Sequence, residues 1–337
     1  MRDKFFRFLV MCALGAAFAA SSIPASAQTF TTFDPDGSVY TYPYGINSSG
    51  TITGFYYESN TPARSFVRAP GGAITTFFVP SAYYGSFADG INDLGVIAGY
   101  YEDYNGYGSF VRSSSGEITT FDVPGAGYDT IAYTIAISLN NAGTITGYYY
   151  EENAYHGFVR NPKGLITKFD VPGDTDIFPT SINNEGMITG YYYDASDMGH
   201  GFVRAADGKF TTFEVPGGNG TYAYSINDEG EVAGTYGEGN GYHGFVRAAD
   251  GTFTTFDGPD DIYGTYAYSI NDGGVATGYY GDPTKSHGFV RGADGTFTTF
   301  DGPSDTYGTY PYAINGSGVI TGYYETKRAA HGFVRTP

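Results

Sequence analysis

The triplet Phe-Val-Arg recurs seven times along this chain at nearly constant spacing. Successive Arg residues of the triplet are 44, 48, 44, 43, 44 and 44 positions apart. A period in the low forties indicates one supersecondary unit repeated many times, and such a unit buries its apolar face only against its neighbours. The repeat therefore constrains the shape of the chain strongly and its function much less. The triplets end at Arg68, Arg112, Arg160, Arg204, Arg247, Arg291 and Arg335.

Each repeat is predicted to form four short strands. In the unit spanning 221–257, residues 222–226 alternate large and small side chains, which is the two-residue period of a strand. Three further strands are predicted at 232–236, 243–247 and 252–257, separated by segments rich in Gly, Asn and Asp. No segment beyond residue 27 shows helical periodicity.

Two tight turns recur in the units, and both carry Gly at their fourth position, where a left-handed backbone conformation is expected. After the first strand these residues are Gly50, Gly95, Gly143, Gly186, Gly230, Gly274 and Gly318. After the third strand they are Gly72, Gly116, Gly164, Gly208, Gly251 and Gly295. The first turn always opens with Asn, whose side chain can bond the turn backbone, so we interpret this Asn as structural. Those residues are Asn47, Asn92, Asn140, Asn183, Asn227, Asn271 and Asn315.

Four antiparallel strands in each of seven units predict an all-β fold, a seven-bladed β-propeller occupying residues 28–337. A β-solenoid is the main alternative, but solenoid coils are usually shorter and need capping segments at their ends. Residues 29–34 match a fourth strand with no third strand before them, and residues 331–335 match a third strand with no fourth after them. We therefore expect the N-terminal strand to complete the seventh blade and close the ring.

The turn geometry also predicts a register in which residues 14 positions apart face each other across the third and fourth strands. This register places each His beside a carboxylate, which we interpret as a cross-strand pair at the outer edge of a blade rather than as a general base. The predicted pairs are His156 with Asp170, His200 with Glu214, His243 with Asp257, His287 with Asp301, and His331 with Asp34. Arg64 and Phe78 replace both partners in the first unit, and Gly108 with Asp122 breaks the pattern in the second.

The first 27 residues are typical of a secretory signal peptide. Arg2, Lys4 and Arg7 precede an apolar run, and small residues at 25–27 form a cleavage site. We therefore expect a secreted or periplasmic protein without membrane insertion. Its single cysteine lies in this leader, so no disulfide is expected in the rest of the chain.

The chain is strongly acidic. Its net charge is −18, and removing the leader residues Arg2, Lys4, Arg7 and Asp3 brings it near −20. Phosphate backbones and anionic membrane surfaces would repel such a chain, so nucleic acid is not an expected partner. The charge is also typical of a soluble protein, and we expect a monomer.

The longer connections, which differ between units, should lie together on the face opposite the tight turns. Loops on a rigid scaffold commonly carry binding residues, and Tyr suits a polar ligand with apolar faces, such as a sugar. The partner expected on this basis is a glycan or a cell-surface polymer, although any single Tyr could instead pack between blades. The candidate ligand-binding residues are Tyr84, Tyr107, Tyr128, Tyr155, Tyr242, Tyr263 and Tyr307.

Cofactors and catalytic groups are not expected. Asp260 and Asp261, and Asp174 with Asp176, could offer oxygen ligands to calcium, but the sequence contains no twelve-residue calcium loop. Solvated turn carboxylates are the simpler interpretation, and with the histidines assigned to strand pairs no zinc site is expected. The sequence contains no cysteine nucleophile beyond the leader, no phosphate loop and no Gly-x-Ser-x-Gly motif, so no catalytic residue is assigned.

The repeat core Ser225-Ile-Asn-Asp-Glu-Gly-Glu-Val-Ala-Gly234, followed by His243-Gly-Phe245, resembles the bacterial extracellular HAF-repeat proteins. That family is named for a His-Ala-Phe triplet, which here reads His-Gly-Phe. The resemblance covers residues 29–335 and implies an exported repeat protein, but it supplies no established activity or catalytic residues. We therefore expect an exported binding or interaction propeller that contacts carbohydrate through the loops of one face. The alternative is a polysaccharide hydrolase or lyase on the same scaffold.

Overall fold

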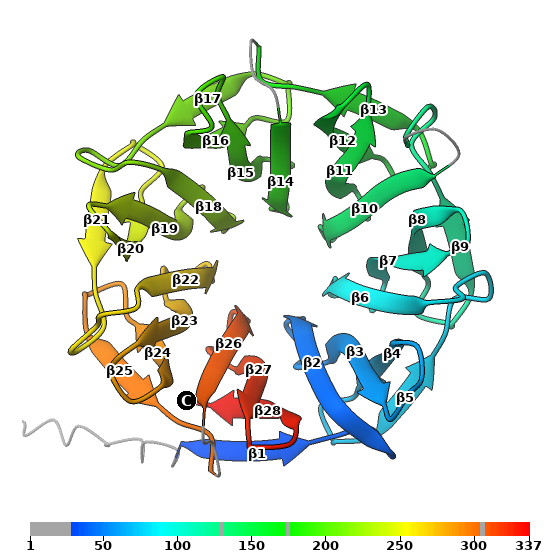
Figure 1. Ribbon diagram of the computed structural model, residues 1–337, viewed down its shortest axis with the longest axis horizontal. Coiled ribbons are helices and arrows are strands. Elements are labelled where there is room, and N and C mark those ends of the chain that lie inside the picture. The colour runs from blue at the N-terminus through cyan, green and yellow to red at the C-terminus, as the bar shows by residue number, and fades with distance from the viewer. Residues whose placement is uncertain (1–27, 128–130, 173–175, 304–306) are drawn as a thin grey trace, which may run out of the picture.

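The computed structural model describes residues 28–127, 131–172, 176–303 and 307–337, and its regular elements are 28 β-strands. The strands form antiparallel groups of four that stand around a common axis like the blades of a propeller (Figure 1). The all-β prediction is confirmed, and the fold is propeller-like. Nowhere in the described ranges does a helix occur that is long and apolar enough to cross a membrane. The leader, residues 1–27, lies outside the described residues.

The first strand of each group lies nearest the axis, and the fourth lies at the outer edge (Figure 1). The first strands are β2 (Ser38–Ile46), β6 (Gly85–Ile91), β10 (Ala132–Leu139), β14 (Asp176–Ile182), β18 (Thr221–Ile226), β22 (Thr265–Ile270) and β26 (Gly308–Ile314). The second strands are β3 (Ile52–Glu58), β7 (Ile97–Asp103), β11 (Ile145–Glu151), β15 (Ile188–Tyr193), β19 (Val232–Glu238), β23 (Ala276–Gly281) and β27 (Ile320–Glu325). The third strands are β4 (Arg64–Arg68), β8 (Gly106–Arg112), β12 (Ala154–Arg160), β16 (Gly199–Arg204), β20 (Gly241–Arg247), β24 (Ser286–Arg291) and β28 (Ala330–Thr336). The outer strands are β5 (Ile74–Phe77), β9 (Ile118–Phe121), β13 (Ile166–Phe169), β17 (Phe210–Phe213), β21 (Phe253–Phe256), β25 (Phe297–Phe300) and β1 (Thr29–Phe33).

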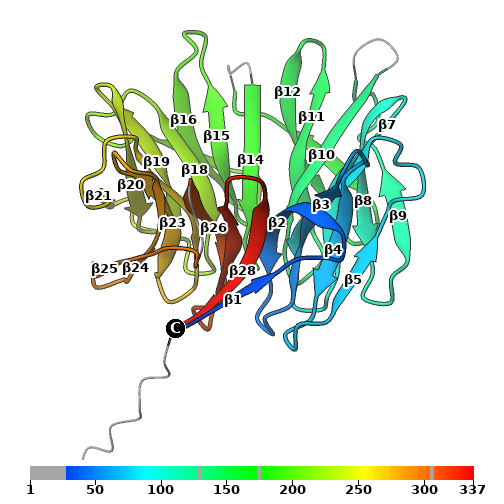
Figure 2. The same ribbon diagram turned by 60° about the horizontal axis from the view of Figure 1, so that its bottom comes forward.

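The N-terminal strand β1 pairs with the C-terminal strand β28, as Figure 2 shows. The pairing is antiparallel, with Phe33 opposite Gly332. Beyond the strand, the Asp34 carboxylate lies 2.7 Å from Nδ1 of His331. The predicted position of residues 29–34 beside 331–335 is therefore found, and β1 serves as the outer strand of the last group.

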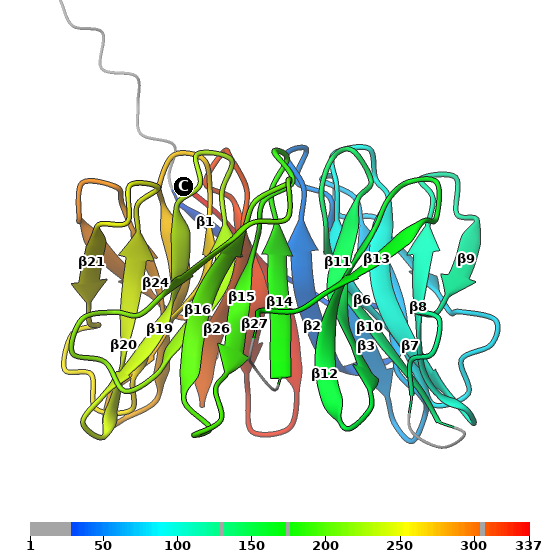
Figure 3. The ribbon, with the colours of Figure 1, turned by 90° about the horizontal axis from the view of Figure 1, so that it is seen from above.

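The strands run between two faces of the molecule (Figure 3). The face with the two tight turns of each unit is called the turn face below, and the opposite face, with the longer connections, is called the loop face. All thirteen turn glycines named from the sequence have positive φ, between 68° and 97°. An L-residue with a side chain rarely adopts this conformation, so the turn prediction is confirmed.

The Phe-Val-Arg triplet joins neighbouring groups. Its Phe is fully buried in all seven copies. Its Arg lies over a Phe ring on the outer strand of the preceding group, with 4.6–4.9 Å between Cζ and the ring centroid. A guanidinium over an aromatic face is attractive and tolerates partial burial. The pairs are Arg68 with Phe33, Arg112 with Phe77, Arg160 with Phe121, Arg204 with Phe169, Arg247 with Phe213, Arg291 with Phe256, and Arg335 with Phe300.

The predicted His–carboxylate pairs are all present at the outer edges of the groups. In each, Nδ1 of the His lies 2.7–2.8 Å from a carboxylate oxygen of the residue predicted to face it. A tyrosine ring of the second strand covers each imidazole, with centroids 5.1–5.3 Å apart. In the first group Arg64 lies over the ring of Phe78 instead, so both partners have changed together. Five equivalent pairs around the periphery support a structural role.

Candidate functional site

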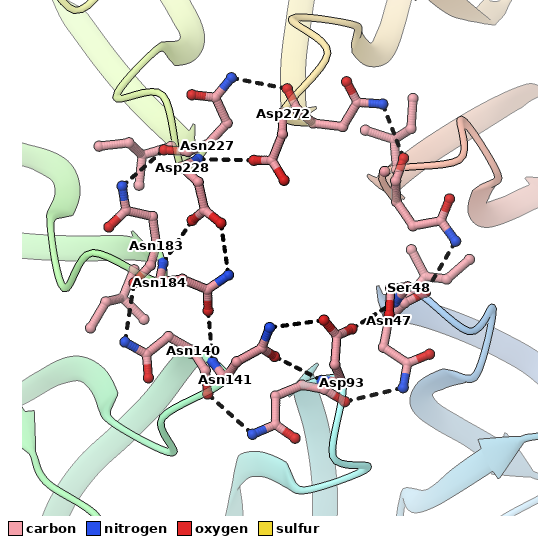
Figure 4. Close-up of a pocket in the computed structure, with 18 of the residues that line it drawn as sticks. Asn47, Ser48, Asp93, Asn140, Asn141, Asn183, Asn184, Asn227, Asp228 and Asp272 are labelled. Atoms are coloured by element: carbon pink, nitrogen blue, oxygen red, sulfur yellow. Dashed lines mark hydrogen bonds between the residues drawn. The ribbon is translucent and has the colours of Figure 1, made fainter.

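At the turn face, the seven turn Asn residues surround the axis and bond to one another (Figure 4). Each Nδ2 donates to the backbone carbonyl of the Asn in the next group, at 2.9–3.1 Å, and Asn315 donates to Asn47. Each Oδ1 accepts the backbone N–H four residues later in its own turn, at 2.8–3.0 Å. The side chain therefore fastens its own turn and the neighbouring one, which accounts for Asn in every repeat. We call this set the Asn ring.

The residue after each Asn forms a second, incomplete tier. Five of the backbone N–H groups in this tier donate to a side-chain oxygen of the next group, the last of these being Asp228 N–H to Asp272 Oδ1 at 2.9 Å. The tier stops at Gly316, which has no side chain. The hollow enclosed by both tiers has a volume of about 280 Å³. The carboxylates of this hollow already accept hydrogen bonds from the protein, so we interpret the hollow as structural.

A central cavity of about 390 Å³ lies along the axis, deeper in the molecule than the hollow at the turn face. A collar of Ile and Leu side chains separates the cavity from the hollow and borders both. The first strand of every group has a β-bulge at this level. A bulge re-aims the side chain of its extra residue, and here that residue lines the cavity. The seven residues are Tyr44, Asp89, Ile137, Thr180, Tyr224, Tyr268 and Tyr312.

Four tyrosines from successive groups form an arc along one side of this cavity. The ring centroids of Tyr224 and Tyr268 lie 5.0 Å apart, those of Tyr268 and Tyr312 also 5.0 Å, and those of Tyr312 and Tyr44 4.8 Å. Asp89 occupies the equivalent position in the next group. Its Oδ2 atom is buried and has no hydrogen-bond partner among the described residues. Burial raises the pKa of this carboxyl well above its usual value.

At the loop face, Tyr83, Tyr84 and Tyr104 form an exposed cluster, which we call the tyrosine platform. Their exposed fractions are 54%, 47% and 68%. The ring centroids lie 4.1 Å apart between Tyr83 and Tyr104, 4.9 Å between Tyr83 and Tyr84, and 5.5 Å between Tyr84 and Tyr104. Three large rings that pack mainly on one another offer a preformed apolar surface with hydroxyl groups at its edges.

The backbone holds this platform in place. Both Tyr83 and Tyr84 donate their N–H groups to the carbonyl of Glu102, at 3.0 and 2.9 Å. Tyr104 lies in the hairpin between β7 and β8, where the Asp103 carboxylate accepts the Asn105 N–H at 2.6 Å. Ile262 and Tyr263 make the same backbone contacts to Gly281 in a later group, but Pro283 and Thr284 occupy the adjacent hairpin. The tyrosine cluster therefore depends on the side chains at these loop positions and not on the backbone alone, since the same backbone contacts in the later group hold no such cluster.

The other candidate tyrosines are not gathered at one place. Tyr107 and Tyr155 are half-buried, with ring centroids 5.1 and 5.6 Å from that of Tyr133. Tyr242 is 43% exposed and lies 5.7 Å from Tyr266 between groups. Tyr263 and Tyr307 are exposed on separate loops. Tyr128 lies outside the described residues.

Two of the turn carboxylates considered for calcium, those of Asp261 and Asp176, accept hydrogen bonds from their own surroundings. The two oxygens of Asp261 accept from the backbone of Tyr263 and Gly264 and from the hydroxyl of Thr265, at 2.5–3.1 Å. Asp176 accepts the Tyr155 N–H at 2.7 Å, whereas Asp174 lies outside the described residues. Within the described ranges, no group of three or more His, Cys, Asp or Glu side chains is arranged to hold a metal ion.

Sequence reasoning did not select Tyr83, Tyr104 or Asp89. The two tyrosines occur in loops recognised as variable, but only contact distances show that they meet Tyr84. Asp89 carried a signal that aligning the repeats could have found. Three positions before the turn Asn, the other units have Tyr, Ile or Thr, and only the second unit has a carboxylate.

No family model matches this chain, and no curated protein matches it. Solved structures with similar folds include a streptogramin B lyase, at 15% identity and a TM-score of 0.58, covering 91% of this chain and 97% of the other. A catalytically inactive virginiamycin B lyase from Staphylococcus aureus with quinupristin is 13% identical, with a TM-score of 0.61, and the match covers 92% of this chain and 100% of the other. The β-propeller domain of the trilobed protease from Pyrococcus furiosus, described as having an open velcro topology, is 11% identical, with a TM-score of 0.62. The match covers 88% of this chain and 94% of the other. At these identities the similarity shows the fold alone.

Proposed function

We propose that this protein is an exported β-propeller that binds a neutral carbohydrate polymer through the tyrosine platform. The observation that carries the proposal is the exposed cluster of Tyr83, Tyr84 and Tyr104 on an anchored backbone. Tyrosine rings pack against the apolar faces of sugar rings, and their hydroxyl groups bond the sugar hydroxyls. Because the chain carries a net charge of −18, an uncharged polymer is favoured over an acidic one.

The scaffold in this proposal is a seven-bladed ring closed by the N-terminal strand. Three contacts support closure: the pairing of β1 with β28, the Asn315 amide on the Asn47 carbonyl, and Arg68 over Phe33. Closure would hold the loops of the first and second groups at fixed positions. The leader sequence and the resemblance to HAF-repeat proteins support export and a place outside the cytoplasm.

The experiment is a glycan array, followed by titration of the best ligand against variants. We expect Tyr84→Ala and Tyr104→Ala each to weaken binding about tenfold, because each removes a stacking ring from the centre of the surface. Tyr104→Phe should keep most of the affinity. Tyr263→Ala is the matched control, since this tyrosine is also exposed and occupies the loop position equivalent to that of Tyr84, but no cluster of rings among the described residues surrounds it.

Three outcomes would count against the proposal. Absence of binding to every glycan of a broad array would contradict the carbohydrate assignment. Equal effects of Tyr263→Ala and Tyr84→Ala would move the site away from the platform. Turnover of a bound glycan would favour the alternative, a polysaccharide hydrolase or lyase.

A further inference from the structure

The central cavity is lined by one acidic side chain and, among the described residues, by no cationic one. Asp89 is the only acidic side chain among the described residues that line the cavity, and none of those residues is Lys, Arg or His. Its Oδ2 atom is buried and accepts no hydrogen bond from any described residue. A buried carboxylate oxygen without a hydrogen bond is costly, so its presence at this position needs an explanation, and a ligand that neutralises the carboxylate supplies one.

The repeats themselves act as an internal control for this position. Equivalent bulges place Tyr, Ile or Thr at the same level in the other six groups, and all of these line the cavity without adding charge. The fold therefore does not require a carboxylate there. The backbone around Asp89 is also closely packed, because a Cβ added to Gly45 would lie 2.9 Å from the Asp89 carbonyl oxygen.

We propose that the central cavity binds a small organic ammonium ion, with its cationic nitrogen at the Asp89 carboxylate and its alkyl part against the tyrosine arc and the Ile–Leu collar. The ammonium supplies the cationic partner that the carboxylate lacks among the residues that line the cavity. Carboxylate and ammonium form a strong, charge-assisted contact when both leave water. A volume of about 390 Å³ lies within the range of small-molecule pockets.

An organic cation fits this cavity better than a metal ion. Calcium takes six to eight oxygen ligands, usually with several carboxylates. The cavity offers one carboxylate, with the hydroxyl groups of tyrosines, of Thr180 and of Ser138, Ser181, Ser225 and Ser269, and much of its remaining wall is apolar. Each of the four serine hydroxyls already accepts a backbone N–H of a neighbouring group. A weakly hydrated ammonium with alkyl substituents gains from aromatic and apolar walls, which a strongly hydrated metal ion does not.

The test is calorimetric titration of the purified protein with choline, with its uncharged isostere 3,3-dimethylbutan-1-ol, and with calcium chloride. We expect choline to bind and the neutral isostere to bind at least about 30-fold more weakly, because only the cation pairs with the carboxylate. Asp89→Asn keeps the size of the side chain and should weaken choline binding by a similar factor.

Two controls separate this site from others. Asp272→Asn removes an exposed carboxylate at the turn face while retaining the oxygen that accepts the Asp228 N–H, and it should leave choline binding unchanged. Asp89→Asn should also leave polymer binding at the tyrosine platform unchanged, so this proposal and the proposed function can fail independently.

The assignment is overturned if choline does not bind, if the neutral isostere binds as tightly, or if Asp89→Asn has no effect on choline. Calcium binding that depends on Asp89 and exceeds that of choline would overturn the organic assignment in favour of a metal. Unchanged circular dichroism of Asp89→Asn would show that a loss of binding does not reflect misfolding.

Discussion

The turn face and the loop face lie at opposite ends of the same strands, yet the residues of the turn face repeat from group to group whereas those of the loop face differ. At the turn face every group presents the same Asn, and each amide bonds the next group. At the loop face the hairpin between the second and third strands contains Ser59 and Asn60 in one group, Tyr104 and Asn105 in the next, and Pro283 and Thr284 in another. Contacts that join neighbouring groups demand one residue type, whereas hairpins that face solvent do not. Residues present in a single group are therefore the ones to examine for function.

The comparison predicts that contacts shared by all groups provide most of the stability. The largest loss of stability should therefore come from removing the N-terminal strand β1, which makes such contacts with both the last and the first group. Deleting residues 29–34 removes Phe33 from beneath Arg68 and Asp34 from His331, and leaves the edge of β28 unpaired. We expect a loss of about 5 kcal/mol or more in the free energy of unfolding, measured by urea denaturation. Replacing the exposed hairpin residue Asn240 with Ser should cost less than about 1 kcal/mol. Similar losses for the deletion and the substitution would contradict the comparison.

The next largest effect should come from one member of the Asn ring. Asn183→Ala leaves the Met187 N–H without its partner and removes one of the two donors to the Asn227 carbonyl, and Asn183 is 4% exposed. A buried polar group left unpaired costs about 1–3 kcal/mol, so we expect a loss of about 2 kcal/mol in thermal or urea denaturation. Asn184→Ala is the control, because Asn184 is in the same turn but exposed, and it should cost less than about 1 kcal/mol. An equal effect of both would show that the turn, rather than the ring, needs these residues.

Asp89 lies between the two faces and should show an effect of opposite sign. Without ligand, Asp89→Asn should stabilise the protein by about 1 kcal/mol, because an amide loses less than a carboxylate on burial. The raised pKa favours the protonated acid in the folded state, so its contribution to stability is present at low pH and is lost as the pH rises through that pKa. The difference in Tm between the variant and the parent should therefore increase with pH. The nearest titratable groups, Tyr44, Tyr100 and Tyr148, have pKa values raised by burial and stay neutral in this range. A constant difference in Tm would contradict the prediction.

The smallest change in stability should come from the tyrosine platform. Tyr104 is 68% exposed, so Tyr104→Ala should change the free energy of unfolding by less than about 0.5 kcal/mol while weakening polymer binding. Differential scanning calorimetry measures the first quantity and titration the second. A clear loss of stability would mean that the cluster packs the loop face rather than serving a ligand.

The sequence predicted contacts that form within one repeat unit, because several copies state the same pattern. The turn glycines and the His–carboxylate pairs follow from local turn geometry and a two-residue strand period, and both were found. The role of the triplet Arg was not predicted, since its Phe partner belongs to a different group and lies about 35 residues away along the chain.

The candidate site was less predictable for a related reason. A bulge at the level of Asp89 shifts the strand by one residue, so simple alternation does not tell which side chain enters the cavity. The meeting of Tyr83 and Tyr84 with Tyr104 depends on two loops from different hairpins, and no periodicity encodes that contact.

The Asn ring also has a direction. Each amide donates to the next group along the chain, and Asn315 returns to Asn47, so the series has no first donor and no last acceptor. A linear stack of repeats loses its outermost contacts first and frays from there, but a head-to-tail cycle offers no such starting point. The backbone amides of the seven Asn turns should therefore exchange with deuterium at nearly one common rate, set by global opening rather than by position along the chain.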